Sequence, residues 1–188
     1  MDAETGEEWG EDPGWHLGWH SLLLLVPIVW MRYARRAGGD SLVNMRSVYL
    51  SFPGSLILFG VVIPFVVPFA SDGALPWALA LAAIALVDSV LPRMFERPIL
   101  CDSLAEHFRT RMFLRIAFAN TTALVGFVFA FSANSGWLYY FGLLLSIPGL
   151  VRAAPTRGAL IREQDELTAR GCNKSLVAAL RTTPPKPK

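Results

Sequence analysis

One ionisable side chain, Asp88, lies inside a long apolar run of this sequence. If lipid surrounds that run, the carboxyl group is a functional candidate, because a charge at such a depth is costly and has to be matched by a partner. Polar side chains at comparable depth in the neighbouring runs could form a layer with it: Ser51, Ser55, Asn120, Thr121, Thr122 and Ser146.

Two interpretations of this polar layer stay open. The layer either holds a proton, an ion or a small polar ligand, or it is an interhelical hydrogen-bond cluster that fixes helix packing. In a variant of the second interpretation, Asp88 extends towards Arg93 at the end of its own run. We favour the structural interpretation.

Two histidines four residues apart, His16 and His20, would share one face of a helix. The spacing suits two ligands of a metal ion or haem, but no third or fourth ligand is evident beyond a nearby acidic stretch. We therefore favour histidines at a membrane interface, and expect no metal and no cofactor. The sequence also has no phosphate-binding loop, nucleophile elbow or zinc-binding pattern, so we expect a protein that is not an enzyme.

The elements that must position these residues are apolar helices. The 188-residue chain is 53% hydrophobic and 17% charged, with a mean hydropathy of +0.42, whereas soluble domains carry roughly a quarter charged residues. Apolar runs predict five membrane spans, at about residues 15–33, 47–70, 75–91, 112–131 and 137–151. The first run either spans or lies flat in the interface, which would leave four spans.

The expected fold is therefore all-α, a polytopic membrane helical bundle over residues 13–151. An acidic extracytoplasmic tail, residues 1–12, precedes it, and a basic cytoplasmic tail with a disordered end, residues 152–188, follows it. Between the third and fourth spans, apolar residues repeat every four positions. They predict an amphipathic cytoplasmic helix at about residues 99–111 on the membrane surface: Leu100, Leu104, Phe108 and Met112.

The distribution of charge predicts the orientation. All 17 Lys and Arg residues fall in three groups: at and after the end of the first span, between the third span and the start of the fourth, and after the fifth. Because basic loops favour the cytoplasm, we expect the N-terminus outside and the C-terminus inside. Arginine outnumbers lysine, which suggests a GC-rich bacterial genome and hence the bacterial inner membrane. Both cysteines, Cys101 and Cys172, then lie in the cytoplasm, where we expect no disulfide.

The second and fourth spans are weakly similar to each other at an offset of 66 residues, which suggests two parallel hairpin repeats. The matching pairs are Phe52 and Phe118, Leu58 and Leu124, Gly60 and Gly126, and Val62 and Val128.

Residues 75–131 combine an Ala-rich span, a cytoplasmic turn with Arg97-Pro98, and a following helix with a small-and-apolar run up to Gly126. In this design the segment resembles the hairpin of the proteolipid (c) subunit of rotary ATPases. The resemblance implies a carboxylate that binds an ion in the second helix, but this sequence has Asn120 there, which does not titrate. The loop is also longer than the family's, so the resemblance implies a shared hairpin design without a rotor function.

From the sequence we expect a small accessory or structural subunit of a larger membrane complex. Its expected partners are the bilayer, other integral membrane subunits or further copies of itself, and anionic lipids at the Arg-rich loops. Net charge is only +2, so we expect no nucleic-acid partner. The alternative function is a small transporter or ion-conducting protein that uses Asp88 and Asn120.

Overall fold

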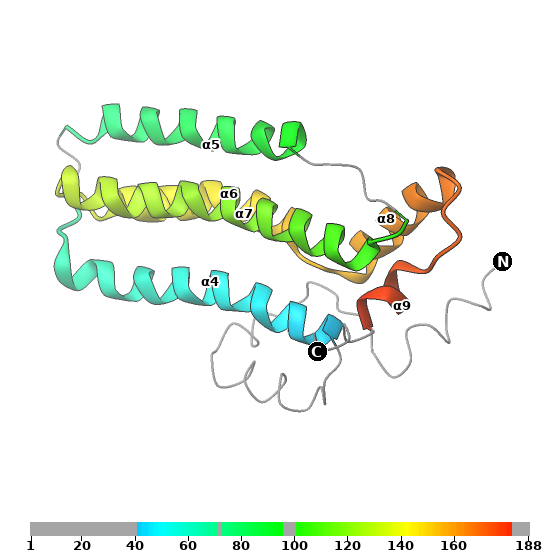
Figure 1. The fold of residues 1–188 in the computed structure, drawn as a ribbon. Helices are drawn as coiled ribbons and strands as arrows, with labels where there is room; N and C mark the ends of the chain where they lie inside the picture. Colours follow the sequence, from blue (N-terminus) through cyan, green and yellow to red (C-terminus); the bar gives the residue numbers. More distant parts are fainter. Residues whose placement is uncertain (1–40, 71–72, 96–100, 182–188) are drawn as a thin grey trace, which may run out of the picture. The chain divides into compact units, whose positions relative to one another are not determined.

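The computed structural model describes residues 41–70, 73–95 and 101–181. The acidic tail, the first predicted span at 15–33, and the candidates His16 and His20 lie outside the described residues. Six helices make up nearly all of the described chain (Figure 1). They are α4 Ser41–Val66, α5 Leu75–Phe95, α6 Leu104–Ser132, α7 Trp137–Ala153, α8 Arg157–Ala169 and α9 Leu176–Arg181.

Three helices, α4, α5 and α6, are long and apolar enough to cross a membrane. The number rises to four if α7 and α8 are counted together as one bent span. The expectation of an all-helical fold with several apolar, membrane-compatible helices is thus confirmed for the described part of the chain. A fifth span and the hairpin repeat stay predictions.

The helix that contains the fourth predicted span, α6, begins at Leu104, before the predicted start at about residue 112. From Leu104 on, the segment expected as an amphipathic helix at about 99–111 forms the first turns of α6 and continues without a break into the apolar run. Leu104, Phe108 and Met112 are buried against protein, as their common spacing of four residues would require of one helical face. No Pro or Gly lies between Leu104 and Thr122 to end the helix.

The chain forms two compact units. Residues 52–95 and 111–153 form the hairpin unit, which holds most of α4, α5, α6 and α7. Residues 41–51, 101–110 and 154–181 form the terminal unit, which holds the beginnings of α4 and α6 together with α8 and α9. The helices α4 and α6 contribute residues to both.

Two tight turns of the hairpin unit meet at one end of its helices. The Gly136 amide donates a hydrogen bond of 2.7 Å to the Pro68 carbonyl, and the Ser135 hydroxyl donates to the Ala70 carbonyl. Asn134 adopts the left-handed conformation (φ 49°) in the α6–α7 turn, where asparagine is tolerated better than most residues. These hydrogen bonds fix the two helical hairpins to each other at this end.

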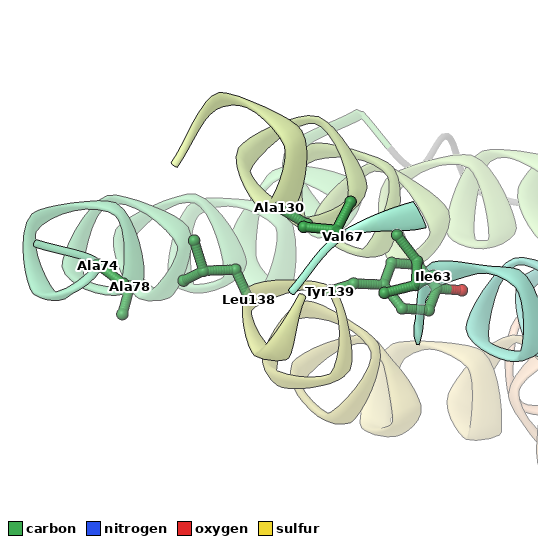
Figure 2. Close-up of a cluster of buried hydrophobic side chains, with 7 residues drawn as sticks. All are labelled: Ile63, Val67, Ala74, Ala78, Ala130, Leu138 and Tyr139. Carbon is green, nitrogen blue, oxygen red and sulfur yellow. The ribbon is translucent and has the colours of Figure 1, made fainter. Parts of the chain in front are cut away.

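A cluster of buried apolar side chains includes residues that flank these turns (Figure 2). Tyr139 and Leu138 of α7 occupy its middle, and both are completely buried. Short side chains from the neighbouring segments let the backbones approach, a kind of packing that is common in membrane helix bundles. The remaining members of the cluster are Ile63, Val67, Ala74, Ala78 and Ala130.

The terminal unit has an apolar core of its own. Leu42 and Leu50 of α4, and Leu160 of α8, are among its buried side chains. The six-residue helix α9 docks through Gln164 of α8, whose side-chain oxygen accepts a 2.7 Å hydrogen bond from the Leu176 amide. The segment expected to be a basic tail is therefore folded as far as residue 181, and the predicted disordered end, 182–188, lies outside the described residues.

The two cysteines, expected to be unpaired, form a disulfide within the terminal unit. That expectation was wrong. Cys101 precedes α6 and Cys172 follows α8, and the fold brings their Cα atoms to 5.9 Å although 71 positions separate them. A sequence separation of this size carries no information about proximity, so only the packing of α8 could reveal the pair.

Candidate functional site

Asp88 and Thr122 form the candidate site, in the interface between α5 and α6. The Thr122 hydroxyl donates a 2.8 Å hydrogen bond to Oδ2 of Asp88. Thr122 is almost fully buried, while Asp88 is half-buried. The bond therefore links two helices in a largely apolar environment.

About one turn after Thr122, α6 makes a close crossing with α7. A Cβ atom added to Gly142 would lie 3.0 Å from the Thr122 carbonyl oxygen and 3.1 Å from Cα of Gly126. Leu81 of α5, which is completely buried, fills the remaining space beside both glycines. Asp88 lies seven residues after Leu81 and Thr122 four residues before Gly126, so both side chains continue the faces that meet at this crossing.

The other residues of the predicted polar layer are not joined to this pair. Ser55 and Thr121 are exposed, and each donates to a carbonyl of its own helix, Phe52 at 2.8 Å and Ala117 at 2.9 Å. Ser146 is buried, but it also bonds within its helix, to the Leu143 carbonyl at 2.7 Å. Ser and Thr side chains in helices commonly satisfy themselves in this way, which lowers their value as indicators of a shared site.

Two further candidates have a different status. Asn120 of α6 is half-buried, and within the described residues its buried Oδ1 has no hydrogen-bond partner. It stands two positions before Thr122, which places it on another side of the helix. The side chain of Arg93, the suggested alternative partner of Asp88, lies outside what the structure describes.

A second interhelical polar contact was not anticipated from the sequence. The Tyr140 hydroxyl of α7 donates to the Gly60 carbonyl of α4 at 2.5 Å. Pro64, inside α4, has no amide hydrogen and so leaves the carbonyl four residues earlier, that of Gly60, without its helical donor. The signal was present in the sequence as a proline four residues after a glycine, but the donor could only be found in the fold.

A single carboxyl group with one hydroxyl donor can hold two helices together, or bind a proton or a cation. Among the described residues, no group of three or more His, Cys, Asp or Glu side chains is placed to hold a metal ion. Comparison with protein-family models, curated proteins and solved structures found no match. The fold and the site thus define the class of the described chain: an α-helical protein with membrane-compatible hairpins and a partly buried Asp–Thr contact.

Proposed function

We propose that this chain is a multi-pass membrane protein that works as a structural or accessory subunit of a larger membrane complex. The observation that carries the proposal is the use of the interior polar groups. Asp88, Thr122 and Tyr140 each make a hydrogen bond from one helix to another, and thereby stabilise the packing. Such contacts suit a structural subunit that binds its partners through its outer surface.

The outer surface of α5 is the proposed site of assembly. Only 11% of its apolar window is buried inside the chain, compared with 28% for α4 and 33% for α6. Ala83, Val87 and Val90 share one face of α5, and all three side chains are exposed. A small residue within such a face lets a helix from another subunit, or from a second copy, approach closely.

The proposed location is the bacterial inner membrane, with five spans that include residues 15–33. Support for the orientation comes from the turns that meet in the hairpin unit, which carry no Lys or Arg in residues 67–74 or 133–136. By the charge rule these turns face outside, and the terminal unit, with its arginines, faces the cytoplasm and its anionic lipids.

In this proposal, α5 and α6 share the helical design of a proteolipid hairpin but not its rotor function. Asn120 cannot exchange a proton, and Asp88, on the other helix, is already bonded to Thr122. Both facts favour a hairpin that packs against partners over one that turns as a rotor.

A second candidate function is transport or conduction of an ion through the Asp88 site. The observation that favours it is Asn120, whose Oδ1 is buried without a hydrogen-bond partner among the described residues. An unpaired polar oxygen at a depth in the bundle similar to that of the Asp88 carboxyl could contribute to an ion path.

One experiment separates the two functions. The full chain is purified in mild detergent, co-purifying proteins are quantified, and the same sample is reconstituted in vesicles for ion-flux measurements. Asp88→Asn is the test variant, because its amide oxygen can still accept the Thr122 hydrogen bond while its charge is lost. For an accessory subunit we expect stoichiometric partners that persist in the variant. Purification without partners, with a flux that the variant abolishes, would establish the transporter instead.

A further inference from the structure

The Cys101–Cys172 disulfide joins two segments of the terminal unit that lie 71 positions apart in the sequence. It links the residue before α6 to the connection between α8 and α9. The Cys172 amide also donates to the Leu167 carbonyl at 3.0 Å, so that this cysteine is held at the end of α8. Gly171, with φ +84°, makes the reversal that presents Cys172 to Cys101.

Lys174 lies beside the pair and contacts the same segment. Its Nζ donates to the Cys101 carbonyl at 3.2 Å and forms an ion pair of 3.7 Å with Asp102. A positive charge next to a cysteine favours the thiolate, which is the form that reacts with disulfides. Both contacts of Lys174 join the segment after Cys172 to the segment of Cys101 and Asp102.

We infer that Cys101 and Cys172 form a reversible thiol–disulfide switch that fastens α8 and α9 to the start of α6. The inference rests on the proposed orientation, which exposes the terminal unit to a compartment where thiols are normally reduced. Reduced cysteines leave α8 and α9 held by side-chain packing, by Gln164 and by Lys174. Oxidation adds a covalent link and restricts the opening of this helical pair.

The oxidant is a low-molecular-weight disulfide. The thiolate of Cys101, which is half-buried, attacks one of its sulfurs and releases the first small thiolate. The thiolate of Cys172, 2% exposed, then attacks Cys101 in the mixed disulfide and releases the second. Two electrons pass to the oxidant, and the two cysteine protons end on the released thiols or in solvent.

The test measures thiol state and tail mobility in the full chain. Cells that express it are quenched with acid before and after exposure to diamide, denatured, and treated with a polyethylene-glycol maleimide that shifts each free thiol on a gel. We expect two free thiols in growing cells, none after diamide, and two again after recovery. Cys101→Ser and Cys172→Ser should each keep one free thiol throughout.

A second readout follows the fold of the tail. Trypsin should cleave the α8–α9 connection, at Arg170 or Lys174, about tenfold more slowly in the oxidised protein than in the reduced protein or in either Ser variant. Cysteines that stay oxidised in growing cells, or that never pair after diamide, would overturn the switch. Labelling of intact cells that express Cys172→Ser with a membrane-impermeant maleimide would identify failure of the orientation, because the unpaired, half-buried Cys101 would react from outside only in that case.

Discussion

The hydroxyl of Tyr140 donates to the carbonyl of Gly60 at 2.5 Å, a carbonyl that Pro64 leaves without a helical donor. A backbone oxygen without a partner is costly in a membrane interior, where no water can replace the bond. Both tyrosine rings pack beside Gly60, because a Cβ atom added there would be in ordinary van der Waals contact with Cε1 of Tyr139 at 3.4 Å and Cε1 of Tyr140 at 3.7 Å. One proline thus explains the position of a tyrosine on another helix.

Replacing Tyr140 by Phe should lower the free energy of unfolding by about 1 kcal/mol, because the Gly60 carbonyl loses its donor. Tyr139→Phe is the matched control. The Tyr139 hydroxyl donates to the Leu56 carbonyl, which can also accept from the Gly60 amide in the helix, so the loss should be smaller. Unfolding in mixed micelles with increasing SDS measures both.

The Pro64→Ala variant tests the cause of this difference. It restores an amide hydrogen for the Gly60 carbonyl, so Tyr140→Phe should cost less in that background than in the natural chain. An equal cost in both backgrounds would show that Pro64 does not create the need for the tyrosine.

Gly142→Ala should destabilise the hairpin unit by about 1–3 kcal/mol. The added Cβ atom would meet backbone on two sides, the Thr122 oxygen at 3.0 Å and Cα of Gly126 at 3.1 Å, so α6 and α7 would have to separate. Gly158→Ala is the control, because the α8 position has no atom within 4 Å of an added Cβ. That substitution should leave stability unchanged or raise it by roughly 0.5 kcal/mol. Thermal unfolding in detergent compares the two, and equal effects would refute the close crossing.

Thr122→Val should destabilise the bundle by about 1 kcal/mol or more, since it removes the hydroxyl that donates to Asp88. Thr121→Val should have little effect, because Thr121 is exposed and bonds within its own helix. Asp88→Asn in the Thr122→Val protein should recover part of the loss by removing a charge that has lost its donor. SDS titration of these three variants measures the differences. In the natural chain, Asp88→Asn keeps an oxygen that can accept from Thr122, so it should cost less than Asp88→Leu, and equal costs would argue against a packing role.

Lys174→Gln should slow the oxidation of the cysteine pair several-fold, because the variant loses the ammonium group beside Cys101. Arg162→Gln removes an equal charge from an exposed position on α8 and should not change the rate. The rate of thiol loss after addition of oxidised glutathione to the purified, reduced chain provides the measurement. Equal rates for both variants would show that Lys174 does not activate the pair.

Much of the helical fold could be predicted from the sequence, because lipid-compatible helices need long uncharged runs. The run predicted at 75–91 appears as α5, and the run at 137–151 as α7. The beginning of α6 was harder to predict, because a polar stretch with one apolar face can form either a separate surface helix or the first turns of a longer helix. The sequence pattern is the same in both cases.

The candidate site was predictable in part. Asp88 was conspicuous as a carboxyl group in an apolar run, and the structure brings it to Thr122. The expected depth of each hydroxyl in the membrane suggested too many partners for Asp88, because depth does not say on which side of its helix a hydroxyl lies. The pairing of Cys101 with Cys172 depends on how the tail folds, and the charge pattern says nothing about that.

The most direct test of the account is the position of the terminal unit and of the α6–α7 turn relative to the membrane. Asn134→Cys and Ser175→Cys are placed separately in a chain that carries Cys101→Ser and Cys172→Ser, and intact bacterial cells are treated with a membrane-impermeant maleimide. We expect the cysteine at position 134 to react at once and the cysteine at position 175 to react only after permeabilisation. The reverse pattern, or a chain recovered in the aqueous fraction without detergent, would contradict it.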